Sequence, residues 1–220
     1  MIYKELNAIA EISGKLGMPD KQNGYKKCAD ELKTAIQSYL WDERNGFFYS
    51  ADANLAPIEK NRWLHSGAPR NWSSLLQKID VWSGFMAMWA EIASPEQAKR
   101  MVAENYLNPE TFNAPYGVRT LSKLEKMYQL VKSGNPSCWL GPVWGISNYM
   151  VFEGLVKYGY IKEAYELAVK TVNLFGRDIE YCGEMHEYYN PETGEEINNP
   201  GFQNRNLLVI NMIEWSKTQL

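Results

Sequence analysis

Glu187 is the residue of this sequence best placed to do chemistry. It lies in the segment 181–206, which carries acidic clusters, aromatic residues, prolines and glycines between two helical patterns. Tyr188 and Tyr189 follow the carboxylate directly, and a turn over 191–194 comes next. A carboxylate against aromatic rings has its charged form disfavoured by desolvation, and a general acid or base needs such tuning. The pattern therefore favours a catalytic carboxylate, with a surface loop in which Glu187 pairs with an arginine as the alternative.

The segment 138–145 places two flat rings beside a predicted helix start. Trp139 and Trp144 bracket the Gly141-Pro142 pair, so both rings and the free N–H groups of the helix would face one rim. Rings that stack on sugar faces, with amides donating to hydroxyl groups, suit a carbohydrate ligand. A hydrophobic staple at a helix N-terminus explains the same residues.

Other patterns are less specific. Arg119 lies between Tyr116 and Ser122 and could clamp a ligand or form a surface ion pair. His65 and His186 are too far apart in sequence to form a ligand pair, and we find no carboxylate at metal spacing. The sequence therefore predicts no metal and no cofactor. It also lacks the serine-hydrolase, P-loop and dinucleotide-binding motifs.

Composition narrows the function classes. The 220 residues carry a net charge of −3, and no stripe of lysine and arginine indicates a nucleic-acid partner. The 8 tryptophans and 14 tyrosines are the unusual feature. Cys28, Cys138 and Cys182 form no CxxC pair, which argues against a disulfide framework or a zinc site. The first residues are amphipathic rather than signal-like, and no apolar run reaches the ~18 residues that span a bilayer. We therefore expect a cytoplasmic protein without membrane contact.

Apolar periodicity predicts three helical hairpins and one further helix. The predicted helices are 2–16 with 20–40, 84–93 with 95–106, 143–158 with 161–175, and 206–218. Short connections make the members of each pair antiparallel, and the longer segments 41–82, 107–141 and 176–205 would gather on one rim. Within them we predict a strand at 46–49 and a short helix near 72–78. A solenoid is the alternative, but no repeat of ~34–47 residues is present.

Two motifs carry a family resemblance. Trp139-x-Gly-Pro-Val-Trp-Gly and Glu187-x-Tyr-x-Pro-x-Thr-Gly closely resemble the C-terminal half of the six-hairpin (α/α) barrel glycosidases, the mannosyl-oligosaccharide glucosidase and trehalase-like enzymes. Leu140 and Phe202-Gln203-Asn204 look more like the mannosylglycerate and glucosylglycerate hydrolase branch. The similarity spans residues 2–216.

The resemblance implies an all-α fold, the C-terminal half of an (α/α)6 barrel, and a single partial glycosidase domain over residues 1–220. It implies inverting hydrolysis of a small glucoside or mannoside such as glucosylglycerate or mannosylglycerate. The general base of the family falls on Glu187. The residues expected to bind the sugar are Tyr116, Gly117, Thr120, Trp139, Trp144, Tyr189 and Gln203. Arg205 departs from the family pattern, because an aromatic residue is expected near that position.

The second carboxyl of an inverting enzyme is not matched. The two carboxyls stand ~6.5–9.5 Å apart in such enzymes. The family's general acid is an Asp in a Gly-Met-Asp-Asn-Ser-Pro-Arg type motif, upstream of the helix that 2–16 resembles. The segment 66–70 echoes this motif without the Asp, and Asp80 is interpreted as a helix cap. We therefore expect weak or no activity from the chain alone, and a homodimer or association with the missing half. The alternatives are a non-catalytic carbohydrate-binding or assembly module, or a sugar epimerase using His65 and His186.

Overall fold

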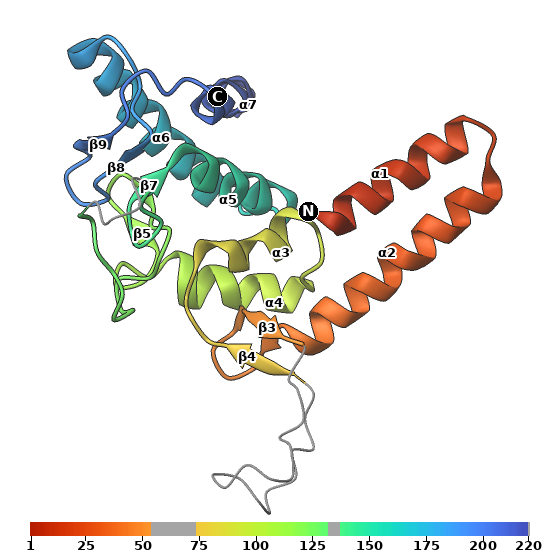
Figure 1. Cartoon of the computed structure of the whole chain (residues 1–220). Helices are drawn as coiled ribbons and strands as arrows, with labels where there is room; N and C mark the ends of the chain where they lie inside the picture. Colours follow the sequence, from red (N-terminus) through yellow and green to blue (C-terminus); the bar gives the residue numbers. More distant parts are fainter. Residues whose placement is uncertain (54–73, 132–136, 220) are drawn as a thin grey trace, which may run out of the picture. The chain divides into compact units, whose positions relative to one another are not determined.

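The computed structural model describes residues 1–53, 74–131 and 137–219 (Figure 1). Contacts between residues divide the chain into two compact units. The hairpin unit consists of Ile2–Asp42 and Phe48–Ile79, and the core unit consists of Glu43–Phe47 with the chain from Asp80 onward. The expectations for His65 and for the segment 66–70 lie outside the described residues.

Two antiparallel helices form most of the hairpin unit. α1 (Ile2–Lys15) and α2 (Pro19–Tyr39) pack against each other, as the predicted hairpin requires (Figure 1). Gly17 makes the turn with a φ of 70°, which residues with a Cβ rarely adopt. Pro19 begins α2 at a position where the absent N–H removes no helical hydrogen bond. The predicted pair 2–16 and 20–40 is confirmed to within one residue at each of its boundaries.

Short strands follow the helical hairpin along the chain. They are β1 (Trp41–Asp42), β2 (Phe47–Phe48), β3 (Ser50–Asp52) and β4 (Leu75–Gln77). The strand predicted at 46–49 is confirmed as β2. The helix predicted near 72–78 is wrong for residues 75–77, because β4 pairs antiparallel with β3, with Ser50 opposite Gln77. A short apolar run does not by itself distinguish a strand from a helix.

Helices also make up most of the core unit. In chain order they are the 3-10 helix η1 (Trp82–Phe85), α3 (Met86–Trp89), α4 (Pro95–Arg100), the π-helix η2 (Met101–Tyr106), α5 (Gly145–Lys157), α6 (Ile161–Cys182), the 3-10 helix η3 (Arg205–Leu208) and α7 (Val209–Lys217). α5 contacts α3, α6 and α7 and buries residues on most of its circumference, as an inner helix does. The third predicted hairpin is present as α5 and α6, and the last predicted helix as η3 and α7. The helix predicted over 84–93 is wrong for residues 90–93, because α3 ends at Trp89 and Glu91 has a left-handed φ of 60°.

The start of α4 follows its sequence signal. Ser94 is the N-cap, Pro95 occupies the first helical position, and the Ser94 hydroxyl accepts a hydrogen bond from the Gln97 N–H at 3.1 Å. The Gln97 side chain in turn accepts from the Ser94 N–H at 2.8 Å, which completes a capping box. The helix predicted over 95–106 continues to its predicted end, but its second half has the wider π geometry.

α6 is longer than predicted, and this correction moves the boundary of the candidate catalytic segment. The prediction ended the helix at residue 175, before Gly176. The helix instead continues to Cys182, because its inward face keeps buried residues as far as Asp178. Gly183 ends it with a left-handed φ of 78°, and its N–H donates to the Ile179 carbonyl. A glycine inside a helix is tolerated where packing continues past it.

Five short strands in the core unit bring the candidate segments together. They are β5 (Asn113–Ala114), β6 (Gly117–Val118), β7 (Val143–Trp144), β8 (Tyr188–Tyr189) and β9 (Glu196–Asn198). β5 and β6 form an antiparallel pair, and β7, β8 and β9 form a sheet in that order, with Trp144 opposite Tyr188. Residue 143, predicted as the first residue of a helix, is therefore in a strand, and α5 begins two residues later.

The all-α fold class is confirmed: helices dominate both units, and the strands are short connections between them. Within the described part of the chain, no helix is both long enough and apolar enough to cross a bilayer.

Candidate active site

Glu187 is buried at the edge of the three-stranded sheet. The residue is 5% exposed, and its N–H donates to the Asn198 carbonyl at 2.9 Å. It immediately precedes β8, so the sheet fixes the backbone from which the carboxylate projects. The strand therefore holds the candidate base in a place that bulk water reaches poorly.

Three neutral groups donate to the Glu187 carboxylate. The Ser137 hydroxyl is 3.3 Å from Oε1, the Asn198 amide is 3.5 Å from Oε2, and the Asn199 amide is 2.5 Å from Oε2. Asn199 has a left-handed φ of 46°, a conformation that asparagine adopts more readily than most residues. All partners of the carboxylate among the described residues are thus neutral. The alternative interpretation, in which Glu187 pairs with an arginine, is not what these contacts show.

A column of four aromatic rings lies beside this carboxylate. Ring centroids of Trp139 and Trp144 are 4.0 Å apart at 13°, and those of Trp144 and Tyr188 are 5.1 Å apart at 21°. Trp82 extends the column, 6.1 Å from Trp139 at 21°. Trp144 therefore stacks against two other rings, and the residue is 1% exposed. Burial also raises the pKa of the Tyr188 hydroxyl.

Residues 137 and 138 connect the Glu187 carboxylate to the aromatic column. Ser137, which donates to Glu187, directly precedes Cys138, whose carbonyl accepts the Trp144 indole N–H at 2.9 Å. Trp139 and Trp82 are only partly buried, so the column is buried at its tyrosine end and accessible at its other end. An acceptor beside flat, partly accessible rings is the arrangement that a sugar with hydroxyl groups and apolar faces requires.

A cation lies against the column. The Arg205 guanidinium carbon is 5.9 Å from the centroid of the Trp144 ring and 5.9 Å from that of Phe202. These distances are within the range of cation–π attraction. The residue that departs from the family pattern thus still contacts the aromatic part of the candidate site, and it adds a positive charge there.

Gly117 and Thr120 hold the backbone around β6 in place. Gly117 has a φ of 144°, and a Cβ there would meet the Asn148 side chain, whose oxygen accepts the Val118 N–H at 2.8 Å. Thr120 is fully buried, and its hydroxyl donates to the Pro142 carbonyl at 2.8 Å. Both residues thus have a structural role in the absence of ligand, and their contact with a sugar remains a prediction.

Tyr116, Tyr189 and Gln203 are not brought to the carboxylate. The Arg177 guanidinium lies 5.3 Å over the Tyr116 ring, and Gln203 is exposed in the turn before η3. Tyr189 is fully buried on the opposite face of the strand from Tyr188, as alternation requires. A substrate contact by any of these three also remains a prediction.

Tyr189 belongs to a buried hydrogen-bonded group. Its hydroxyl donates to Asp178 at 2.7 Å and accepts the His186 N–H at 2.8 Å. Desolvation would raise the pKa of Asp178, but hydrogen bonds from Tyr189 and His186 hold this pKa below its ordinary value. Burial, followed by this hydrogen bond to Asp178, raises the pKa of Tyr189. The sequence predicts no metal site, yet Asp178, Cys182 and His186 form a group of side chains that could hold a metal ion.

Arg119 is neither a surface residue nor free for a ligand. It is 2% exposed, pairs with Glu192 through two nitrogen atoms, and donates to the carbonyls of Pro109, Thr111 and Asn113. The ion pair expected from the sequence is therefore present, but Arg119 is buried rather than at the surface, and its donors are occupied by protein groups rather than available to a ligand. A guanidinium can be buried when carbonyls and a carboxylate satisfy most of its donors.

The helical fold and the buried carboxylate beside aromatic rings define a candidate glycosidase. Residues 1–204 match the family described as the mannosylglycerate hydrolase MGH1-like glycoside hydrolase domain, and the chain belongs to this family. The resemblance to six-hairpin glycosidases is thereby confirmed.

Two curated relatives illustrate the family. The chain is 28% identical to a cytosolic neutral trehalase of Kluyveromyces lactis over 185 residues, covering 82% of this chain and 22% of the relative. It is 27% identical to a mannosylglycerate hydrolase of Rubrobacter radiotolerans over 192 residues, covering 84% of this chain and 36% of the relative. The chain therefore spans only about a fifth to a third of the length of these relatives.

Solved structures support the fold. A GH63 mannosylglycerate hydrolase from Thermus thermophilus in complex with glucose aligns with a TM-score of 0.65 at 22% identity, covering 94% of this chain and 43% of that one. Neutral trehalase from Saccharomyces cerevisiae aligns with a TM-score of 0.67 at 19% identity, covering 96% of this chain and 36% of that one. Both neighbours are (α/α)6 barrel enzymes, so the chain has the fold of part of such a barrel.

Proposed function

We propose that Glu187 is the general base of an inverting glycoside hydrolase acting on a small glucoside or mannoside, such as glucosylglycerate or mannosylglycerate. The observation that carries the proposal is the buried carboxylate that accepts three neutral hydrogen bonds beside the aromatic column. A carboxylate offers about four acceptor positions, so the three donors among the described residues leave room for the hydrogen of an attacking water. The base would take this proton as the water attacks the anomeric carbon.

The rings would hold the sugar. Trp139 and Trp82 are the partly accessible members of the column, so a sugar face would stack at that end, while Trp144 supports the column from within. The substrate class is supported by the relatives named mannosylglycerate hydrolase, and trehalase is also a name among them. Relatives named cytosolic support the cytoplasm as the proposed compartment.

The general acid is proposed to come from another segment. The sequence contains no match to the acid motif of the family, and a second carboxyl ~6.5–9.5 Å from Glu187 is needed. We propose that this segment, or a second copy of the chain, packs against the exposed apolar side chains of α1. These include Ile2, Ile9 and Ile12, together with Leu16 just after the helix, all of which α2 leaves uncovered. A continuous apolar face of this kind on a helix favours a partner.

The test is complementation. The chain is purified alone and together with the part of the Rubrobacter radiotolerans enzyme that it does not match, and hydrolysis of both glycosides is followed by NMR. We expect hydrolysis only in the mixture, first appearance of the inverted anomer, and loss of activity in Glu187→Gln. Glu180→Gln removes an equivalent charge from an exposed position of α6 and serves as the matched control.

Several outcomes would contradict parts of this proposal. Hydrolysis by the mixture containing Glu187→Gln would exclude the base role, and a retained anomer would exclude inversion. Strong activity of a chain that light scattering shows to be monomeric would exclude an acid from elsewhere. Equal sugar affinity of wild type and Glu187→Gln by calorimetry, without turnover, would favour the non-catalytic binding module. The epimerase alternative depends on His65, which is outside the described residues.

A further inference from the structure

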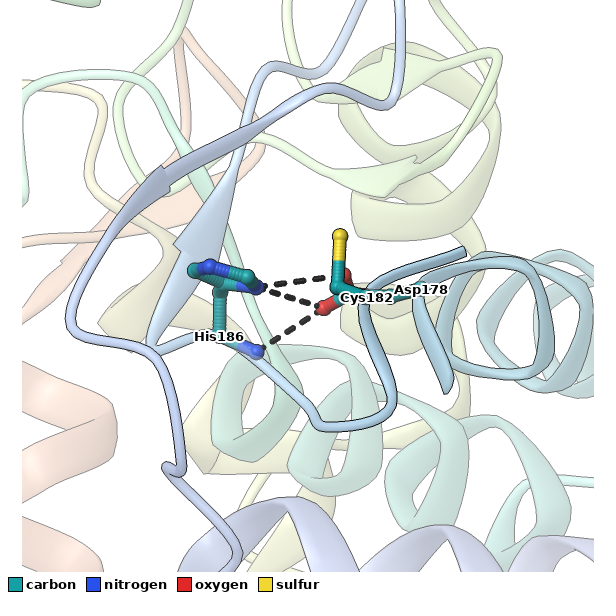
Figure 2. Close-up of side chains that lie close together, drawn as sticks. All are labelled: Asp178, Cys182 and His186. Atoms are coloured by element: carbon teal, nitrogen blue, oxygen red, sulfur yellow. Dashed lines mark hydrogen bonds and ion pairs between the residues drawn. The ribbon is translucent and has the colours of Figure 1, made fainter. Parts of the chain in front are cut away.

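Three side chains with different ligand atoms meet at the end of α6. Asp178 and Cys182 are one helical turn apart on the same face, and His186 returns to them after the left-handed turn at Gly183 (Figure 2). One carboxylate oxygen, the thiol sulfur and one imidazole nitrogen all lie within 4.8 Å of one another. This group is separate from the Glu187 carboxylate, although His186 directly precedes that residue.

We propose that Asp178, Cys182 and His186 bind a divalent transition-metal ion, with Zn²⁺ as the best match. Sulfur, imidazole nitrogen and carboxylate oxygen together form a zinc-type ligand set, whereas Ca²⁺ and Mg²⁺ take oxygen ligands. Ligand atoms of a tetrahedral zinc site are about 3–4 Å apart, as bond lengths of about 2.0–2.3 Å require. The observed spacing reaches this geometry with small side-chain rotations.

The surroundings of the group favour a cation. The three residues lie at the C-terminal end of a long helix, where the dipole attracts positive charge. A cleft of about 440 Å³ opens beside Asp178 and Cys182 and is also lined by Glu195 and Glu196. The Glu196 Oε1 is 4.0 Å from the Cys182 sulfur, so this carboxylate can supply a fourth ligand.

The positively charged side chain that lines the cleft, Arg177, already has hydrogen-bond partners. Arg177 lines the cleft, but its guanidinium donates to the carbonyls of Thr193 and Gly194 and lies over the Tyr116 ring. It therefore points along the turn rather than occupying the position between the three ligands. The cleft provides a path for the ion from solvent to an exposed thiol.

Partners of Asp178 support the ligand role. The Tyr189 hydroxyl and the His186 backbone N–H both donate to Oδ2, at 2.7 and 2.9 Å, while the ring Nδ1 of His186 is 2.9 Å from Oδ2 and 3.1 Å from Oδ1. Oδ1 can thus turn to a metal while the two donors to Oδ2 hold the carboxylate in orientation, as partners of metal ligands commonly do. The bound ion would join the end of α6 to the residue preceding Glu187.

Cobalt spectroscopy tests the proposal on the whole chain. Co²⁺ should bind with one equivalent and give a thiolate charge-transfer band in the near ultraviolet. The band should be lost in Cys182→Ser and persist in Cys28→Ser, because Cys28 is an exposed free cysteine on α2, distant in sequence from the group. His186→Gln should weaken binding at least about tenfold. A band that persists in Cys182→Ser, or that requires Cys28, would overturn the assignment.

A second measurement needs no variant. Cys28 and Cys182 are both exposed, so iodoacetamide should modify both in the metal-free chain, and mass spectrometry distinguishes the two sites. Saturating Zn²⁺ should protect Cys182 and leave the modification rate of Cys28 unchanged. Equal rates at Cys182 with and without Zn²⁺, together with no cobalt band, would refute the site. Neither readout depends on hydrolysis, so the metal site and the proposed glycosidase activity can fail independently.

Discussion

The amide of Asn199 should position the carboxylate of Glu187, the proposed general base. Its Nδ2 is 2.5 Å from Glu187 Oε2, whereas the Ser137 and Asn198 donors are 3.3 and 3.5 Å from the carboxylate. The shortest of the three bonds should contribute most to the orientation. A hydrogen bond to a charged group contributes about 1.5–3 kcal/mol, and the lower value applies because Asn199 is an exposed residue. A loss of about 1.5 kcal/mol in the transition state corresponds to roughly a tenfold decrease in kcat/KM.

Two variants of Asn199 separate the hydrogen bond from the backbone conformation. Asn199 has a φ of 46°, so Asn199→Ala loses the amide and also strains the backbone, whereas Asn199→Gly loses only the amide. In the complemented assembly, we expect both variants to lower kcat roughly tenfold with little change in KM. An activity of Asn199→Gly within twofold of wild type would refute the positioning role. A loss confined to Asn199→Ala would assign the effect to the backbone.

Two further predictions concern stability. Trp144→Phe removes the indole N–H that donates to the Cys138 carbonyl, together with part of the stacked ring area. We expect the free energy of unfolding to fall by about 1–3 kcal/mol, measured by urea unfolding followed with far-UV circular dichroism. An unchanged midpoint would contradict the buried, stacked position. The hydrogen bond from Arg100 holds the pKa of Glu104 below its ordinary value of 4.5, so the pair stabilises the fold above that pH, and this stability is lost as pH falls through the folded-state pKa. Glu104→Gln should therefore lower the free energy of unfolding by about 0.5 kcal/mol at pH 7, a small value because the pair is exposed to solvent. The loss should be much smaller below the folded-state pKa of Glu104. A loss of the same size in acid would refute this pH dependence.

The helical pairs could be predicted because their signals are local. Gly17 and Pro19 mark a turn between two periodic segments, and Ser94 marks the start of α4. The end of α6 could not be placed, because Gly176 and Gly183 look alike in sequence. Only the second has a left-handed backbone, and packing carries the helix past the first.

The candidate base could be located from its motif, but its partners could not. Ser137 and Asn199 reach Glu187 through turns that no periodic pattern specifies, and Arg119 is buried because several segments fold around it. The proposed metal ligands have one local signal in the sequence. Asp178 and Cys182 are four residues apart, which places them on one helix face. A search for paired histidines does not detect this spacing.

The alternation of Tyr188 and Tyr189 constrains the length of the segment that carries the candidate base, Glu187. One side chain enters the ring column and the other enters the helical core, because consecutive residues of a strand face opposite ways. Inserting a single residue between Glu187 and Tyr188 would turn Tyr188 toward the core and move the Tyr189 hydroxyl away from Asp178. The turn that leads to β9 is constrained as well, because Glu192 pairs with the buried Arg119 and the Gly194 carbonyl accepts a hydrogen bond from Arg177.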